Sequence, residues 1–346
     1  MRRTVRIALA GVALGALFGL AGCAPPPGPA PDDAESSDAA TDQALVEAAK
    51  AEGSVMWYTA YAEDRARHAA DAFTTEYGIP VEIVRMPSPT LIQRYQAERD
   101  SGAHVADLID YSGADPFLSA EEGEFVVLAD SALPSVEAWP TDQIAGGVAP
   151  RLSLEPLGIA YNTDLIARNE VPTEWTDVVA PAMRDGLAHP NWDSPSYLKL
   201  LELLDDEFGD DFLAELRSAD GTIYEGGLPA MQAVAAGENT LLLPTAASFV
   251  LPLQNSGAPV DFAVISPTIG IEVYAAVPEK APHPNAGRLL LDFLMSVPGQ
   301  AEISQNQSVS ALPDVPNSLS AKGVDYRFPD VVSAAERDEL LAKISP

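Results

Sequence analysis

Ser54-Val55-Met56-Trp57-Tyr58 is the short apolar stretch that opens the segment deciding the fold. It reads as a strand, and an apolar face with helical spacing follows it and ends at Gly78. The pattern then repeats, and the elements expected in order are a strand at 54–58, a helix at 64–77, a strand at 81–86, a helix at 90–99 and a strand at 105–110. Strands alternating with helices of this length predict an α/β fold with a mostly parallel sheet.

A second α/β unit follows a less regular stretch at residues 123–153. We expect strands at 158–162, 222–224, 241–244, 260–265 and 271–277, and helices at 175–179, 196–216, 228–236, 246–254 and 286–295. A further helix is expected ahead of the first strand, from Gln43 to Gly53. No exact internal repeat relates the two units. Two α/β units in one chain predict two lobes, each a mixed, mostly parallel sheet flanked by helices, with a cleft between them.

The composition bounds the possible partners. Of 346 residues, 47% are hydrophobic, which supports a sizeable core. The chain has 20 Lys and Arg against 51 Asp and Glu, which gives a net charge of −31. Such a chain would repel a phosphate backbone, so nucleic-acid binding is not expected. We interpret the acidity as serving solubility or salt tolerance. A single cysteine excludes a disulfide framework and a CxxC metal site.

The N-terminus has the pattern of an export signal. A basic head that ends at Arg6 precedes an apolar run of about 14 residues, which is shorter than the ~20 needed to span a bilayer. Leu20-Ala21-Gly22 then precedes Cys23, and this arrangement resembles the lipobox of bacterial lipoproteins. We therefore expect residues 1–22 to be a signal peptide and Cys23 to be lipidated. Residues 23–42, rich in proline and then in acids, are expected to be a disordered tether.

Candidate ligand-binding residues follow from where strands end. In open α/β sheets, ligands bind beyond the carboxyl ends of the strands, where helix N-termini present free N–H groups. Tyr61 and Trp192 could form aromatic walls, and Asp193 and Glu225 could neutralise a cation or hold hydroxyls. The same residue types also cap helices and form turns, so both interpretations stay open. The candidates are Thr59, Ala60, Tyr61, Ser112, Asp115, Asn191, Trp192, Asp193, Glu225, Thr245 and Ser248.

The order of several short motifs resembles one family. The segments that carry the resemblance are Val55–Ala60, Ala72–Glu82, Pro156–Asn162, Pro172–Asp177 and Pro282–Ser296. Together with the lipobox they are similar to bacterial ABC-transporter extracellular solute-binding lipoproteins, a family of receptors for ferric iron, thiamine, polyamines and phosphonates or sugar phosphates. The resemblance implies a two-lobed periplasmic-binding-protein-like fold of type II. We expect lobe 1 to hold residues 43–153 plus about 262–305, and lobe 2 about 154–261 plus about 306–346.

The resemblance also implies a function. Such a protein captures a small polar solute by closure of its two lobes and delivers it to an ABC permease, without making or breaking a bond. We expect a monomer that needs no cofactor and is lipid-anchored to the outer face of the cytoplasmic membrane. No residue is assigned as a metal ligand, and whether a metal accompanies the solute stays open. Ser112, Thr245 and Ser248 would suit a phosphate or phosphonate, whereas Trp192 with an acid would suit an amine.

Two alternatives remain at this point. Ferric-iron members commonly use two adjacent tyrosines in the second lobe; this chain has no adjacent pair, and the equivalent position falls near Ala246–Ser248. An exported hydrolase could use Ser196 and Lys199, which match SxxK, but its KTG partner motif is absent, as are GxSxG, HExxH and the P-loop. The four histidines lack metal-ligand spacing. No catalytic residue is therefore assigned.

Overall fold

The computed structural model describes residues 33–346 except 185, 220, 321, 329–331 and 345–346. The expected signal peptide, Cys23 and the start of the tether lie outside the described residues. Helix α1 spans Asp33–Glu52, so it begins ten residues before the expected start at Gln43. The part of the tether from 33 to 42 is therefore helical, not disordered. Its alanines favour helix, and its acids suit a helix N-terminus.

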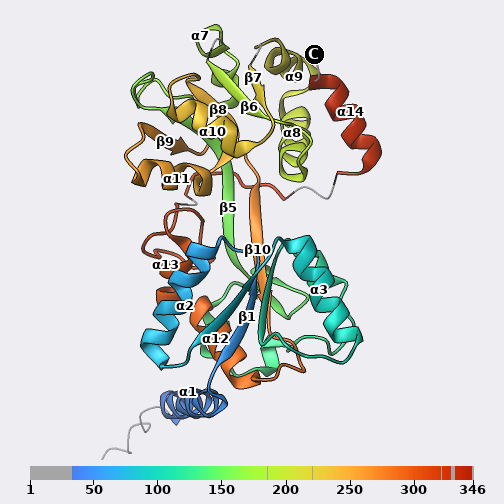
Figure 1. The fold of residues 1–346 in the computed structure, drawn as a ribbon, viewed down its shortest axis with the longest axis vertical. Helices are drawn as coiled ribbons and strands as arrows, with labels where there is room; N and C mark the ends of the chain where they lie inside the picture. Colours follow the sequence, from blue (N-terminus) through green and yellow to red (C-terminus); the bar gives the residue numbers. More distant parts are fainter. Residues whose placement is uncertain (1–32, 185, 220, 321, 329–331, 345–346) are drawn as a thin grey trace, which may run out of the picture.

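Two bodies stand one above the other and are joined by the long strands β5 and β10 (Figure 1). We call lobe 1 the body that contains β1, β2 and β3, and lobe 2 the body that contains β6, β7 and β8. The strand order is β2-β1-β3-β10-β5-β8-β6-β7, with β4 and β9 also paired to β5. The strands are β1 Val55–Thr59, β2 Val81–Arg85, β3 Leu108–Ser112, β4 Ile144–Ala145, β5 Ala149–Asn162, β6 Leu187–Pro190, β7 Thr222–Tyr224, β8 Leu241–Ala246, β9 Val260–Ala263 and β10 Gly270–Ala276.

The strand directions place the carboxyl ends of the parallel strands of each lobe on the side that faces the other lobe. Strand β10 is antiparallel to both β3 and β5, so β1, β2 and β3 run in the direction of β5, which leaves lobe 1 for lobe 2. Strand β8 is antiparallel to β5, and β6 and β7 are parallel to β8, so all three run back toward lobe 1. The carboxyl ends of the parallel strands in both lobes therefore point at the waist between them.

Helices cover both faces of each sheet. In lobe 1, α2 and α12 share one apolar cluster and α3 lies in another; in lobe 2, α8, α9 and α14 share one, and α10 and α11 another. The helices are α2 Glu63–Tyr77, α3 Ser88–Asp100, α4 Asp115–Leu118, α5 Pro134–Ala138, α6 Trp175–Val178, α7 Pro181–Arg184, α8 Pro195–Phe208, α9 Asp210–Ser218, α10 Gly227–Ala235, α11 Ala247–Asn255, α12 Pro284–Met295, α13 Val297–Ser304 and α14 Ala334–Ile344. Each lobe therefore has its own three-layer core.

Several elements differ from the sequence expectation. Strand β5 begins at Ala149, inside the stretch expected to be irregular, because pairing with β10 and β8 supports it along its length. The helix expected over 196–216 is divided at Gly209, whose φ of 78° suits glycine and interrupts the helix. The structure also contains α14, which the sequence did not lead us to expect.

The chain crosses between the lobes later than expected on its return. Ile265 and Ile269 belong to the lobe 2 core, so the return crossing lies near Gly270 instead of 262. Ala311 and Leu312 pack against the lobe 1 core, so the last crossing comes after them instead of after 305. In both cases apolar side chains complete the core to which they belong.

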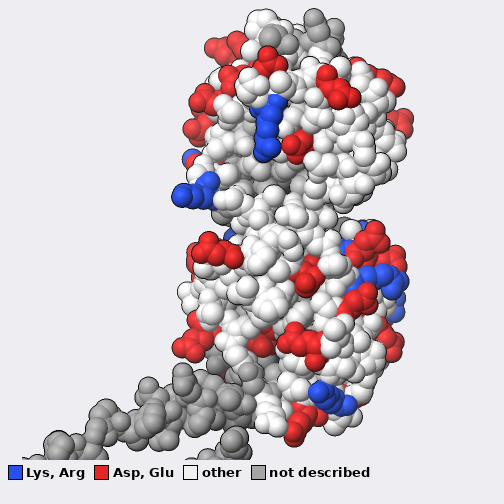
Figure 2. Space-filling view, turned by 90° about the vertical axis from the view of Figure 1, so that its left-hand side faces the viewer, with Lys and Arg blue, Asp and Glu red and all other residues white. Residues whose placement is uncertain are grey.

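On the face that Figure 2 shows, Asp and Glu are more widespread than Lys and Arg among mostly uncharged residues, and the molecule narrows at the waist between the lobes. Within the part of the chain that the structure describes, no helix combines the length and apolar character that a bilayer crossing requires.

Candidate functional site

Loops at the facing strand ends form the candidate site. Lobe 1 contributes the loops after β1, β2 and β3, and lobe 2 contributes those after β6, β7 and β8. Every candidate ligand-binding residue lies in one of these loops, at the end of the preceding strand or, for Asp115 and Ser248, in the first turn of the helix that follows. The candidate site is therefore the waist where two sets of loops oppose each other beside the crossing strands β5 and β10 (Figure 1).

The buried Asp110 on β3 fixes the loop after β1 by accepting hydrogen bonds from the loop and from β1. The backbone N–H of Ala60 donates to Asp110 Oδ1 at 2.8 Å, and Trp57 Nε1 donates to Oδ2 at 2.8 Å. Thr59 is fully buried, and its hydroxyl oxygen accepts a hydrogen bond from the Tyr61 N–H. Burial raises the pKa of Asp110 to about 7, although these donors counteract the shift. Thr59 and the Ala60 backbone thus shape the loop, and the Thr59 side chain is buried beneath it.

Tyr61 has a structural environment that differs from an open aromatic wall. Its side chain is 3% exposed, its hydroxyl shares a 2.8 Å hydrogen bond with Ser153, and the Arg65 guanidinium lies 4.6 Å from the ring centroid. Burial raises the pKa of its hydroxyl. The Tyr61 ring is therefore buried between α2 and the crossing strand β5, and we call the buried group formed by Tyr61, Arg65 and Glu155 the floor of the site.

A buried ion pair joins the lobes at this floor. Arg65 on α2 pairs with Glu155 on β5 and donates to Ser308 Oγ at 2.6 Å. The other oxygen of Glu155 accepts from Ser248 Oγ on α11 of lobe 2, at 3.2 Å. Ser248 was expected at the site; Arg65 and Glu155 were not. Arg65 does carry a signal, because it stands one and two turns before Ala69 and Phe73 on the buried face of α2, where a cation needs a partner.

Ser112, Asp115 and Arg85 form the exposed rim of lobe 1. Ser112 ends β3, and its N–H donates to Ser88 Oγ at 2.9 Å. Asp115 is exposed at the start of α4. Arg85 ends β2, and its Nε donates to the Tyr61 carbonyl at 3.1 Å while the side chain stays exposed. Arg85 was not among the residues expected at the site, although it lies near the end of the strand predicted at 81–86.

The lobe 2 candidates divide between rim and interior. Asn191 and Glu225 are exposed in the loops after β6 and β7. Thr245 is buried at the end of β8, and no hydrogen-bond partner for its Oγ1 is found among the described residues. Asp193 is exposed but already engaged, because Arg337 on α14 donates to both of its oxygens, at 2.7 and 2.8 Å. That contact lowers the pKa of Asp193.

Trp192 belongs to the core of lobe 2. It is 9% exposed, and its ring centroid lies 4.8 Å from that of His189. Burial lowers the pKa of His189 to about 4, so this histidine is neutral at pH 7. Both side chains line a small pocket with Leu216 and Ile344 of lobe 2. In this conformation Trp192 is not an aromatic wall of the cleft.

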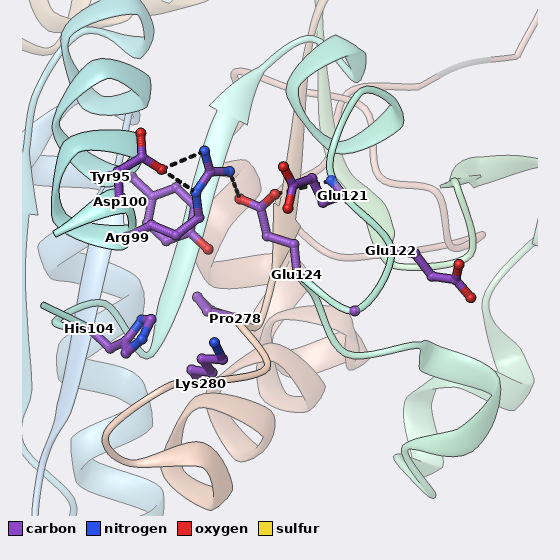
Figure 3. Close-up of a pocket in the computed structure, with 10 residues that line it drawn as sticks. Tyr95, Arg99, Asp100, His104, Glu121, Glu122, Glu124, Pro278 and Lys280 are labelled. Carbon is purple, nitrogen blue, oxygen red and sulfur yellow. Dashed lines mark hydrogen bonds and ion pairs between the residues drawn. The ribbon is translucent and has the colours of Figure 1, made fainter. Parts of the chain in front are cut away.

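A pocket of about 330 Å³ lies elsewhere in lobe 1 (Figure 3). It is lined by the C-terminal end of α3 and by His104, which precedes β3, so it is at the end of the lobe away from the waist. Its polar wall is internally paired: Arg99 contacts Asp100 at 2.9 Å and Glu124 at 2.8 Å. We therefore do not place the solute there. Among the described residues, no group of three His, Cys, Asp or Glu side chains is placed to hold a metal.

Two lobes with opposed strand ends and a two-strand connection define a type II binding-protein fold. The chain belongs to the family of bacterial extracellular solute-binding proteins, whose model matches residues 62–306. It is thus a solute-binding protein of the kind that serves ABC transporters, and this family and fold are those of binding proteins, not of enzymes. A comparison by sequence with curated proteins finds no match.

Solved structures share the fold at low sequence identity. Iron-bound HitA from Pseudomonas aeruginosa is 19% identical with a TM-score of 0.62, over 84% of this chain and 98% of that one. AfuA from Actinobacillus pleuropneumoniae, with fructose-6-phosphate bound, is 18% identical with a TM-score of 0.60, over 84% and 97%. An ABC-transporter substrate-binding protein from Bradyrhizobium japonicum is 14% identical with a TM-score of 0.66, over 85% and 100%.

Proposed function

We propose that this chain is the substrate-binding lipoprotein of an ABC importer, and that it captures a small polar solute between its lobes and delivers it to a membrane permease. The observation that carries the proposal is the opposed arrangement of the two sets of parallel strand ends across β5 and β10. A solute in the cleft contacts both lobes only when they close. Such a ligand stabilises the closed state by its differential contacts, and the closed state is the one that the permease would recognise.

The proposed binding residues are the exposed candidates on the two rims together with the half-buried Ser248. Ser112 and Asp115 face from lobe 1, and Asn191, Glu225 and Ser248 from lobe 2. Thr59, Ala60, Tyr61, Thr245 and Trp192 would contribute by shaping the loops, and Asp193 by fixing the loop after β6 to α14.

Export and anchoring follow from the N-terminal sequence. We propose cleavage before Cys23, lipidation of Cys23 and attachment of a monomer to the outer face of the cytoplasmic membrane. The family is extracellular, which supports export. The lipobox-like Leu20-Ala21-Gly22-Cys23 supports the anchor.

A thermal-shift screen of the full chain in detergent tests the function. The panel is ferric citrate, spermidine, thiamine, fructose 6-phosphate, methylphosphonate and sorbitol. A ligand that binds only the folded protein adds about 2.7 kcal/mol at 100 times its Kd, which raises the unfolding temperature measurably. A decrease in the radius of gyration by small-angle scattering with the same compound would demonstrate closure. Saturable binding without closure would contradict the proposed mechanism.

Ferric iron remains the second candidate within the same family. The iron-bound neighbour supports it through the fold, whereas Ala246, Ala247 and Ser248 at the position expected for a tyrosine pair argue against it. A visible charge-transfer absorption band on adding ferric citrate would favour iron, since tyrosine phenolate ligands produce one. A stabilising organic ligand without such a band would exclude iron.

A further inference from the structure

We propose that the solute is an organic anion with an apolar or aromatic portion. Arg85 of lobe 1 would hold the anionic group, and Tyr197 and Phe249 of lobe 2 would hold the apolar portion. The inference rests on the proposed function, since it assigns a substrate class to the same cleft.

The lobe 2 half of this subsite lies at the start of three helices. Tyr197 is in the first turn of α8, Gly227 begins α10, and Phe249 is in the first turn of α11. A Cβ atom built on Gly227 would lie 3.3 Å from the Tyr197 hydroxyl and 3.8 Å from Phe249 Cε1. The three residues are thus neighbours in space, and the missing side chain of Gly227 leaves the surface between the two rings open.

This surface is more apolar than a site for a bare metal ion requires. Phe249 is 39% exposed and Leu228, the residue after Gly227, is 53% exposed. Large apolar side chains that are exposed on loops at a candidate binding site indicate a ligand that covers them. Burial raises the pKa of Tyr197 to about 12, and no hydrogen bond of its hydroxyl to another described residue is found, so the hydroxyl is available to a ligand.

The lobe 1 half carries the positive charge. Among the loops at the facing strand ends (59–63, 85–90, 112–116, 190–197, 224–228 and 246–249), Arg85 is the only Lys or Arg in the sequence. It directly precedes α3, whose first turn contains no acidic residue. A guanidinium beside an unneutralised helix N-terminus favours a carboxylate, phosphate or phosphonate group. In a chain of net charge −31, this is where an anion is attracted.

Contacts connect the two halves across the waist. Arg85 bonds the Tyr61 carbonyl, and the Tyr61 ring lies under Arg65. Arg65 pairs with Glu155, and Glu155 bonds Ser248, the residue before Phe249. Because Arg65 and Glu155 neutralise each other, they add no net charge at the floor. Arg85 of lobe 1 and Phe249 of lobe 2 are therefore linked by one continuous series of contacts across the waist.

A matched ligand pair measures the apolar half. Phenylphosphonate and methylphosphonate share the anionic group, and only the first has an aromatic ring. By isothermal titration calorimetry on the full chain, we expect phenylphosphonate to bind at least 10-fold more tightly. Phe249→Ala and Gly227→Ala should each remove that advantage and leave methylphosphonate affinity unchanged. Arg85→Gln should weaken both ligands about 10-fold or more.

The control is Gly226→Ala. Gly226 has an extended backbone, φ −175° and ψ 174°, and its new Cβ would have no atom within 4 Å, so affinity should not change. Equal affinity for the two phosphonates, or no binding of phenylphosphonate, would overturn the inference. If fructose 6-phosphate or spermidine then closes the protein, the proposed function stands and only this inference fails. If no compound in either panel binds, both fail.

Discussion

Arg65 and Glu155 lie 90 positions apart in the sequence and form an ion pair at the junction of the two lobes. Arg65 is 2% exposed and Glu155 is 13% exposed. Glu155 also accepts a hydrogen bond from Ser248 of lobe 2, so one carboxylate contacts a helix from each lobe. Glu155 of the crossing strand β5 therefore links α2 of lobe 1 to α11 of lobe 2. Any closure of the lobes must keep these two contacts or break them.

Arg65→Met should destabilise the protein strongly. Removal of one partner from a buried pair leaves the other uncompensated, which typically costs about 3–5 kcal/mol. We expect the lower part of that range because Glu155 retains some solvent contact. Urea unfolding followed by circular dichroism measures the change. Arg67→Met on the exposed side of the same helix is the control and should have little effect; equal losses in the two variants would contradict a special role for the buried pair.

Asp110 should make stability fall as the pH rises from about 4 to about 7. Its pKa is near 3.9 in an unfolded chain and is raised to about 7 in the fold. The folded state therefore holds the Asp110 proton more tightly than the unfolded chain does. The contribution of Asp110 to the free energy of unfolding is complete below its unfolded pKa and is lost as the pH rises through its folded pKa. Urea unfolding across this pH range should show a smaller decline for Asp110→Asn than for the parent. An identical slope would show that Asp110 titrates normally.

His189 should make stability rise as the pH rises from about 4 to about 6.5, which is opposite to the effect of Asp110. Its pKa is lowered to about 4 from an ordinary value of 6.5 because burial disfavours the charged ring. Its contribution is present above pH 6.5 and is lost as the pH falls toward 4, since the unfolded chain then takes up a proton that the fold does not. His189→Gln should remove this acid-side loss. NMR titration of the His189 ring is an independent check, and a pKa above 6 would refute the expectation.

Helix α14 should be held to lobe 2 by apolar packing more than by its ion pairs. Leu340 is 5% exposed in the lobe 2 core, and Leu340→Ala should cost about 2–4 kcal/mol. Arg337 pairs with Asp193 at the surface, where solvent screens the interaction, so Arg337→Gln should barely change the unfolding midpoint. If the second variant proves the more damaging in urea unfolding, the ion pairs dominate instead.

Gly158 should not tolerate a side chain. A Cβ at this position on β5 would overlap the carbonyl oxygen of Ala263 on β9, and backbone on that side cannot move without breaking the β5–β9 pairing. Gly158→Ala should therefore lower the thermal midpoint by several degrees. Gly226→Ala, where the space is open, is the matched control. An unchanged midpoint in Gly158→Ala would show that β9 pairs loosely with β5.

Local patterns were sufficient for the elements that bury an apolar face. The strand at Val55–Thr59 and the helix that ends at Tyr77 were expected almost at their observed bounds, since alternation and helical spacing report burial directly. Strand β5 was only partly expected because its support comes from partners distant in the sequence. Helix α14 was not expected, since its docking depends on a core that other segments build.

For the candidate site, too, local patterns predicted some features, and others depended on contacts between distant segments. Strand-end loops could be named from sequence because parallel sheets bind ligands there. The environments of Tyr61 and Trp192 could not, since the same aromatic residue suits a cleft wall or a core, and only the packing around it decides. Arg65, Glu155 and Arg85 were missed because their roles depend on partners from other elements.

By itself, the sequence determined an acidic, two-unit α/β chain with an export-type N-terminus and the family motifs, because composition, periodicity and short motifs are local properties. The tertiary structure alone decided which loops face each other, that Glu155 links α2 to α11, and that Gly227 lies between Tyr197 and Phe249. These are contacts between distant segments, and their geometry is fixed only when the strands pair and both cores close.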